Sequence, residues 1–252
     1  QTPKGRQVIP ATIPGSIHTD LMAAGLLGDI RIDGTESEQE WIRNADSLYA
    51  TKVPGHSAGG SYELKFDGLD TLATVSINGA VKLQSENMHR AFVLDVTDVA
   101  VNGFDLSVAF KAPLPEALKR EQEMGTYPNP YDMPYNYFRK MACSFGWDWG
   151  PITITSGIWK PIWLTQWDQG ILDEVGLVSD VVDGVPHLRV RTVGRGSATD
   201  VEVVISGHGR EKRVTTTLGS DESIACEGFD LWHPRGFGEA TLYSVSVYLK
   251  DE

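Results

Sequence analysis

Residues 61–79 read Ser-Tyr-Glu-Leu-Lys-Phe-Asp-Gly-Leu-Asp-Thr-Leu-Ala-Thr-Val-Ser-Ile-Asn-Gly. Apolar and polar side chains alternate in this stretch, and the apolar positions are Tyr62, Leu64, Phe66, Ala73, Val75 and Ile77. A period of two is typical of a strand with one buried face. Asn78-Gly79 favours a tight hairpin, because both central positions of a type I′ turn need positive φ. The stretch therefore predicts antiparallel strands joined by a short turn.

The same period recurs on both sides of this stretch. Strands are expected at residues 91–96, 104–110, 152–155, 158–167, 188–192, 201–206, 214–218 and 242–249. One helical patch, at 115–124, interrupts them. The order shows no regular alternation of strand and helix, which a parallel sheet with crossover helices would need. We therefore expect an all-β fold built from β-sandwiches.

The composition shifts near residues 167–170, and we place a domain boundary there. The expected domains are residues 1–168 and residues 169–252. The second has a length close to that of an immunoglobulin-like sandwich, although it lacks the Cys–Trp–Cys pattern of antibody domains.

A short helix is expected near the start of the chain. Ser16 can cap it, because a serine hydroxyl accepts hydrogen bonds from the first unpaired backbone N–H groups. Ile17 and Leu21 share its apolar face, whereas His18 and Asp20 lie off that face. We expect His18 to be a surface or capping residue.

The composition limits the function classes. The net charge of −12 disfavours nucleic acid and anionic membranes as partners. No apolar run is long enough to span a bilayer. Cys143 and Cys226 are too few for a disulfide framework, and neither has a metal-type spacing with the scattered histidines. We expect free thiols, no metal and no cofactor, and the compartment stays open, although the composition is compatible with a bacterial cytoplasm.

Residues 143–151 read Cys-Ser-Phe-Gly-Trp-Asp-Trp-Gly-Pro and contain the chain's most unusual local pattern. Trp147, Asp148 and Trp149 are flanked by glycine and proline, which disfavour an ordinary central strand. Two indoles beside a carboxylate could bind a sugar, which has an apolar C–H face and a rim of hydroxyls. The alternative is a structural corner with buried tryptophans and Asp148 capping a turn. Composition alone favours the corner.

The preceding loop, residues 125–140, changes that balance. It holds four tyrosines, three prolines and two asparagines without apolar periodicity. Long irregular loops in compact domains are usually functional or disordered, and disordered segments are poor in aromatic residues. An ordered aromatic loop leading into the Trp-Asp-Trp stretch therefore favours one wall of a carbohydrate site.

Several catalytic signatures are missing from the sequence. It contains no Gly-x-Ser-x-Gly, no phosphate loop and no dinucleotide fingerprint. A glycosidase pair could be drawn from Glu121, Glu123, Asp132 and Asp148, but such a pair needs rigid supports and a separation of roughly 5 Å in a retaining enzyme. Loop acids without placement are better interpreted as solvated surface charge.

Seven stretches together resemble the N-terminal region of β-mannosidases of glycoside-hydrolase family two, in collinear order over nearly the whole chain. They are residues 13–21, 68–73, 77–79, 87–90, 145–151, 155–161 and 231–238. The Trp-Asp-Trp stretch within Phe145–Pro151 points to the mannosidase branch of that family. The resemblance implies a galactose-binding-like jelly-roll β-sandwich over residues 1–168, followed by an immunoglobulin-like β-sandwich over residues 169–252.

The resemblance also implies a role for the site. In the family, a (β/α)₈ barrel carries two catalytic glutamates, and the Trp-Asp loop helps to wall the pocket for the terminal mannose. Carried over, Trp147 would line that pocket and Asp148 would accept hydrogen bonds from sugar hydroxyls. Arg139 and Lys140 match the basic pair before the loop and would support it, and Trp149 is assigned to packing.

The resemblance departs at both ends of the chain. The opening strand is expected to be truncated, and the sequence stops where the family's barrel would begin, so no residue here is assigned as a catalytic acid or nucleophile. The leading hypothesis is the non-catalytic N-terminal part of a retaining exo-β-mannosidase. Its expected partners are a β-mannoside glycan and the barrel of the same polypeptide. The alternatives are a free-standing carbohydrate-binding module and a structural sandwich pair for protein contacts.

Overall fold

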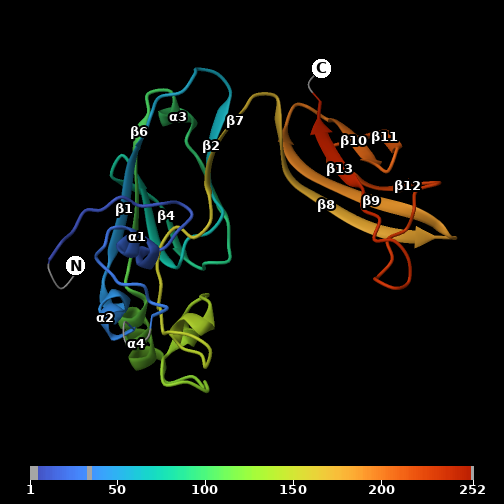
Figure 1. Cartoon of the computed structure of the whole chain (residues 1–252). Helices are drawn as coiled ribbons and strands as arrows, with labels where there is room; N and C mark the ends of the chain where they lie inside the picture. The colour runs from blue at the N-terminus through green and yellow to red at the C-terminus, as the bar shows by residue number, and fades with distance from the viewer. Residues whose placement is uncertain (1–4, 33–35, 251–252) are drawn as a thin grey trace. The chain divides into compact units, whose positions relative to one another are not determined.

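The computed structural model describes residues 5–32 and 36–250 and divides into two compact units, Gln1–Gln166 (unit 1) and Trp167–Glu252 (unit 2). Figure 1 labels most of the elements. Those of unit 1 are α1 (Ile17–Ala23), α2 (Glu36–Gln39), η1 (Ile42–Asn44), β1 (Ser47–Val53), β2 (Ser61–Phe66), β3 (Leu72–Ile77), β4 (Ala80–Glu86), β5 (Phe92–Asp95), α3 (Thr97–Ala100), β6 (Phe104–Phe110), α4 (Pro113–Met124), η2 (Tyr135–Tyr137), η3 (Ala142–Phe145) and β7 (Ile162–Trp167). Those of unit 2 are β8 (Gly170–Val182), β9 (Val185–Gly196), β10 (Asp200–Gly207), β11 (Arg210–Thr217), β12 (Asp221–Ala225) and β13 (Ser244–Leu249).

Unit 1 is a sandwich of a sheet with strand order β1-β6-β3-β4 and a sheet with order β5-β2-β7 (Figure 1). The predicted hairpin is confirmed. Strands β3 and β4 pair antiparallel, and Asn78 and Gly79 between them have φ values of 51° and 79°. The Asn78 side chain also fixes the neighbouring turn, because its Oδ1 accepts the backbone N–H of Asp105 at 2.9 Å.

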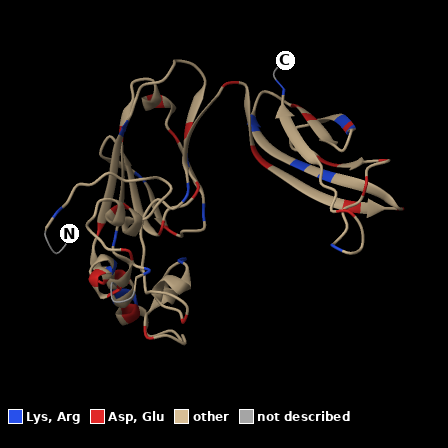
Figure 2. Cartoon of the chain, in the orientation of Figure 1, with Lys and Arg blue, Asp and Glu red and all other residues tan. Residues whose placement is uncertain are grey.

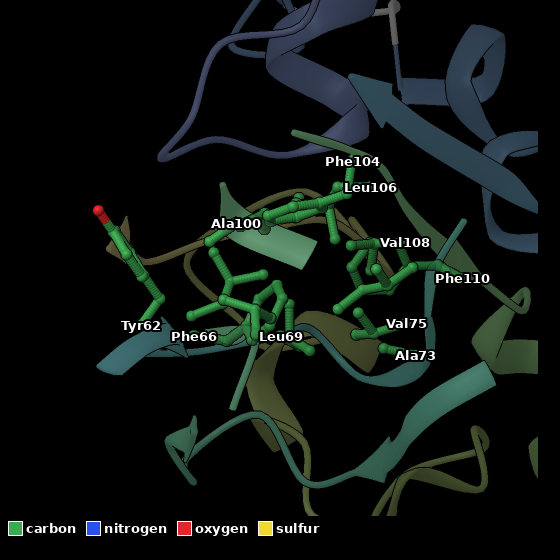
Figure 3. Packing of buried hydrophobic residues seen from close by; sticks show 14 residues of the cluster. Tyr62, Phe66, Leu69, Ala73, Val75, Ala100, Phe104, Leu106, Val108 and Phe110 are labelled. Atoms are coloured by element: carbon green, nitrogen blue, oxygen red, sulfur yellow. The ribbon is translucent and has the colours of Figure 1, made fainter. Parts of the chain in front are cut away.

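The alternating apolar residues of the two sheets meet in one core (Figure 3). Its buried members include Tyr62, Phe66, Leu69, Ala73, Val75, Phe104, Leu106, Val108 and Phe110. The ring of Tyr62 is buried, while its hydroxyl donates to the carbonyl of Ser57 at 2.7 Å. Burial of this one-sided apolar pattern, which the period of two predicts, is what drives the two sheets together.

Helix α1 begins after Ser16 as expected. The Ser16 hydroxyl accepts the backbone N–H of Thr19, whose own hydroxyl accepts the N–H of Ser16, so both ends of the cap are satisfied. The expectation for His18 is wrong, since His18 is 4% exposed and Asp20 only 3%. The reason is tertiary, because the side of α1 that carries these residues is covered by other parts of unit 1. Tyr49 donates its hydroxyl to Asp20 at 3.2 Å.

Two strand predictions after the Trp-Asp-Trp stretch need correction. Residues 152–155 form no strand, because the backbone N–H of Ile152 donates to the Glu36 carboxylate at 2.7 Å rather than to a neighbouring strand. The strand expected over 158–167 begins only at Ile162, directly after Pro161. A proline has no N–H for a sheet ladder, so the strand starts beyond it.

Unit 2 has a sheet of order β11-β10-β13 and a sheet of order β12-β9-β8. Its core includes Val190, Val201, Val203, Ile205 and Ile224. The sequence did not predict β8 or β12, because most side chains of β8 are exposed and the burial contrast that marks a strand is weak. Three arginines of β9 form ion pairs with acids of the adjacent strands β8 and β12. Figure 2 shows basic and acidic residues along these strands. The predicted all-β fold class is confirmed.

No helix within residues 5–32 and 36–250 is long and apolar enough to cross a membrane. Cys143 and Cys226 are both free thiols, as expected, and Cys226 is buried in unit 2.

Candidate functional site: an exposed aromatic turn

The Trp-Asp-Trp stretch forms a tight turn on the surface of unit 1. Trp147 and Gly150 face each other in a β-bridge, and Gly146 enters the turn with a φ of 134°, which favours glycine. Trp147 is 39% exposed, Trp149 is 73% exposed, and Asp148 is also exposed. The structural-corner alternative, with both tryptophans in the core, is therefore wrong.

Four aromatic rings form a continuous row at this turn. The ring centroids of Trp149 and Trp147 lie 4.7 Å apart, those of Trp147 and Tyr131 lie 5.4 Å apart, and those of Tyr131 and Tyr135 lie 6.1 Å apart. Partial desolvation raises the pKa of the Tyr131 phenol, and the negative charge of Asp148 raises it further. The Asp148 carboxylate thus lies near the phenol of Tyr131. Sequence reasoning identified the tyrosine-rich loop but did not single out Tyr131.

The carboxylate of Asp148 makes no hydrogen bond within the described residues of the chain. It is an acceptor beside two aromatic faces, in a turn with ample exposed apolar area. Such a combination can stack a sugar ring and accept hydrogen bonds from its hydroxyls.

The turn is anchored by apolar residues on either side of it. Phe145, just before the turn, is 2% exposed, and Ile154, just after it, is 1% exposed. Both pack in one cluster with Leu114 and Ala117 of α4. The exposed rings are therefore held on buried neighbours, which limits the motion of the turn relative to the sandwich.

Lys140 and Asp70 form a buried ion pair that joins the loop to the sandwich. Their side chains are 0% and 4% exposed, and Nζ lies 2.5 Å from Oδ1 and 2.7 Å from Oδ2. Thr155, after the turn, donates its hydroxyl to Asp70 Oδ2 at 2.7 Å, and Thr71 donates to Oδ1. Burial lowers the pKa of Lys140, and the facing Asp70 carboxylate opposes that change. Asp70 thus links segments on both sides of the aromatic turn to the segment that leads into β3.

Backbone hydrogen bonds bring distant stretches of the sequence to the same place. Asp70 and Gly157 exchange N–H···O bonds of 2.9 and 2.8 Å. Gly15 and Ile17 donate to carbonyls of residues 156–158, at 2.9 Å each. Gly157 has a φ of 147°, and a Cβ there would lie 3.0 Å from the Ser16 Cα. Only glycine fits this crossing without strain.

Arg139 and Lys140 are neighbours in sequence but face different surroundings. The backbone of Arg139 pairs with residues 86–88, because its N–H donates to the Glu86 carbonyl at 3.3 Å and its carbonyl accepts the Met88 N–H at 2.9 Å. Its side chain is exposed and lines a groove beside β4. The structure thus brings Trp147, Asp148 and Trp149 together at the turn, while Lys140 is interior and Arg139 lies in that groove.

The acids weighed as a catalytic pair come from three different segments: Glu121 and Glu123 from α4, Asp132 from the loop before η2, and Asp148 from the aromatic turn. Glu123 lies at the end of α4 next to Lys119, at 3.9 Å, and Asp132 is an exposed loop residue. In residues 5–32 and 36–250, no group of three or more His, Cys, Asp or Glu side chains is placed to hold a metal ion.

Residues 1–160 match the family described as glycosyl hydrolase 2 galactose-binding domain-like. The chain therefore belongs to this family, and the resemblance inferred from the sequence motifs is confirmed. Beta-mannosidase B of Emericella nidulans is 33% identical over 100% of this chain, and Beta-mannosidase B of Aspergillus clavatus is 33% identical over 95% of it. The chain spans 32% and 30%, respectively, of the length of these curated relatives.

Solved structures agree with this assignment. The crystal structure of Beta-D-Mannosidase from Dictyoglomus thermophilum is 30% identical, with a TM-score of 0.86 over 96% of this chain and 32% of that one. An exo-chitosanase from Amycolatopsis orientalis has a TM-score of 0.62 at 18% identity, over 96% of this chain and 28% of that one, and so shares the fold. The predicted galactose-binding-like sandwich followed by an immunoglobulin-like sandwich is confirmed.

Proposed function

We propose that this chain is the N-terminal, sugar-binding part of a retaining exo-β-mannosidase that removes terminal non-reducing β-D-mannose. The observation that carries the proposal is the similarity to β-mannosidases over the full length of the chain, at 33% identity to a curated relative and a TM-score of 0.86 to a solved structure. These relatives are enzymes of which the chain spans about a third. That favours a role inside a larger enzyme over a free-standing binding module.

In this proposal the aromatic turn supplies one wall of the mannose pocket. The indole of Trp147 offers an apolar face to the C–H face of the sugar, and Asp148 accepts hydrogen bonds from its hydroxyls. Trp149 contacts Trp147, with centroids 4.7 Å apart and ring planes tilted by 40°, and so acts as a packing support. Lys140 supports the loop through its buried pair with Asp70, and Arg139 supports it through its backbone pairing with residues 86–88.

The proposal gives this chain no bond-breaking residue. Hydrolysis with retention needs two carboxyl groups on rigid supports, one as acid/base and one as nucleophile. We assign both to the catalytic barrel of the same polypeptide, as the family resemblance implies. The isolated 252-residue chain is therefore expected to be inactive on β-mannosides. Its contribution is to orient the sugar and to select it by its hydroxyls.

The test is Asp148→Ala in the full-length enzyme, assayed on a chromogenic β-mannoside. Loss of a charge-assisted hydrogen bond to a sugar hydroxyl is worth about 1.5–3 kcal/mol, so kcat/KM should fall by about 10- to 150-fold. Glu123→Ala, at an exposed acid of α4, serves as the matched control and should leave kcat/KM unchanged. Unchanged kinetics of Asp148→Ala, in a protein with unaltered thermal stability, would refute the assigned role.

A titration of the isolated chain with mannobiose separates the proposal from the free-standing module. One wall of a pocket should bind too weakly to give a measurable heat. Clear binding by the isolated chain that is lost in Trp147→Ala would favour a free-standing carbohydrate-binding module instead.

A further inference from the structure

A concave surface lies in unit 1, beside the outer strand β4. This β4 groove has a volume of about 600 Å³, within the range of about 300–1,000 Å³ typical of ligand sites. Three separate segments line it, at residues 84–92, 124–127 and 136–139. None of its lining residues belongs to the aromatic turn at residues 143–151.

The charges of the β4 groove do not cancel. Its carboxylate, Glu86, accepts two hydrogen bonds from the Arg120 guanidinium, at 2.6 and 3.0 Å, and this contact lowers the pKa of Glu86. The other charged lining residues are Arg90 and Arg139. Neither has an acidic partner among the described residues, and Arg90 lies over the ring of Phe92 at 5.2 Å. Two guanidinium groups thus remain available to a ligand, in a chain whose net charge is −12.

The β4 groove also has an ordered aromatic surface. Tyr127 stacks on Tyr137 with centroids 5.1 Å apart and an interplanar angle of 16°. The Tyr137 hydroxyl donates to the Gly125 carbonyl at 2.6 Å and accepts the Tyr127 N–H at 3.2 Å, which fixes both rings. Tyr127 remains 41% exposed. Beside the rings, the buried Oδ1 of Asn136 has no hydrogen-bond partner.

We propose that the β4 groove binds an anionic saccharide unit. Guanidinium groups bind carboxylate and phosphate through paired N–H donors, and a flat tyrosine ring stacks on a sugar face. A neutral sugar would use only the tyrosine surface, and a small inorganic anion would use only the two arginines, whereas an anionic sugar uses both. The anionic group is a carboxylate or a phosphate, since both present the same chemistry to Arg90 and Arg139.

Titrations of the 252-residue chain with D-glucuronic acid, mannose 6-phosphate, D-mannose and acetate test this proposal, with binding followed by ligand-observed NMR. At least one of the two anionic sugars should bind about tenfold more tightly than mannose and acetate, and which of them does so identifies the anion. Its affinity should fall several-fold as NaCl rises from about 50 mM to about 500 mM. Equal affinities for the four ligands, or no effect of salt, would overturn the proposal.

Arg90→Gln and Arg139→Gln keep a polar side chain and remove the charge. Each should weaken binding of the preferred sugar at least about fivefold, while Arg235→Gln, at an exposed arginine of unit 2, should leave it unchanged. Circular dichroism verifies that the variants are folded, and the salt titration on the unaltered chain does not depend on them. Wild-type affinity in both folded variants contradicts the proposal. Asp148 does not line the β4 groove, so the Asp148→Ala result does not decide this proposal.

Discussion

Replacement of Lys140 by methionine should destabilise unit 1 strongly. The substitution keeps a long unbranched side chain at a position with 0% side-chain exposure, but it leaves the Asp70 carboxylate, 4% exposed, without its cation. Breaking a buried ion pair on one side costs about 3–5 kcal/mol, because the remaining charge stays out of water. For a unit of this size, each kcal/mol lowers Tm by about 2–4 °C, so the expected decrease is about 6–20 °C.

A double-mutant cycle isolates the pair from the two side chains. Asp70→Asn alone removes the carboxylate and should also destabilise, because it leaves the Lys140 ammonium buried without a counter-charge. Asp70→Asn with Lys140→Met removes both charges, so the loss should be smaller than the sum of the two single losses by at least about 1–2 kcal/mol. Lys65→Met, also in unit 1, is the matched control. Its partner Asp67 lies at 3.1 Å, but the two side chains are 48% and 26% exposed, so the loss should stay below about 1 kcal/mol.

Urea unfolding followed by tryptophan fluorescence is a suitable assay. Five of the seven tryptophans lie in unit 1, so the signal reports mainly on that unit. A loss below about 1 kcal/mol for Lys140→Met, equal to that of the surface control, would refute the reasoning. Strict additivity in the double mutant would likewise show that the two charges are not coupled.

Two further predictions concern buried positions of unit 1. Burial, with a further contribution from the Lys140 charge, lowers the pKa of His18 from 6.5 to about 4. The unfolded chain therefore binds this proton first, and the free energy of unfolding should fall by about 3 kcal/mol as pH drops from about 7 to about 4. His18→Gln should reduce this dependence of the unfolding free energy on pH, measured by urea unfolding. His56→Gln, at an exposed histidine, is the control and should not. The same pH dependence in both variants would contradict the lowered pKa of His18. Gly68→Ala should cost about 1–3 kcal/mol, because its Cβ would lie 2.5 Å from Trp159 Nε1. Gly150→Ala, with nothing within 4 Å, should be neutral, and equal thermal stability of the two variants would count against the close contact.

The structural predictions that were confirmed depend on local sequence patterns. The alternation at Tyr62, Leu64 and Phe66 placed β2, and Asn78-Gly79 placed the β3–β4 hairpin, because side-chain period and turn geometry involve only a few neighbouring residues. Ser16 marked the start of α1 for the same reason. Strand β8 was missed because most of its side chains are exposed, so the sequence shows no buried face.

The candidate site divides in the same way. The Trp-Asp-Trp pattern was visible in the sequence, and together with the other matching stretches it identified the family. The exposure of the two tryptophans was not visible in the sequence, because the same residues also fit a buried structural corner. Tyr131 was one of four tyrosines in an irregular loop, and only the structure places it next to Trp147.

The sequence by itself determined the all-β fold class, the hairpin and the family of this protein, because each follows from short local stretches and requires no knowledge of which distant residues touch. Only the tertiary structure decided that Lys140 is buried against Asp70 while Arg139 is exposed, and that His18 lies in the interior. It also decided that residues 15–17, Asp70 and Gly157 meet at one crossing. Contacts between such distant residues depend on how whole sheets and loops pack, and no local pattern of charge or polarity encodes that packing.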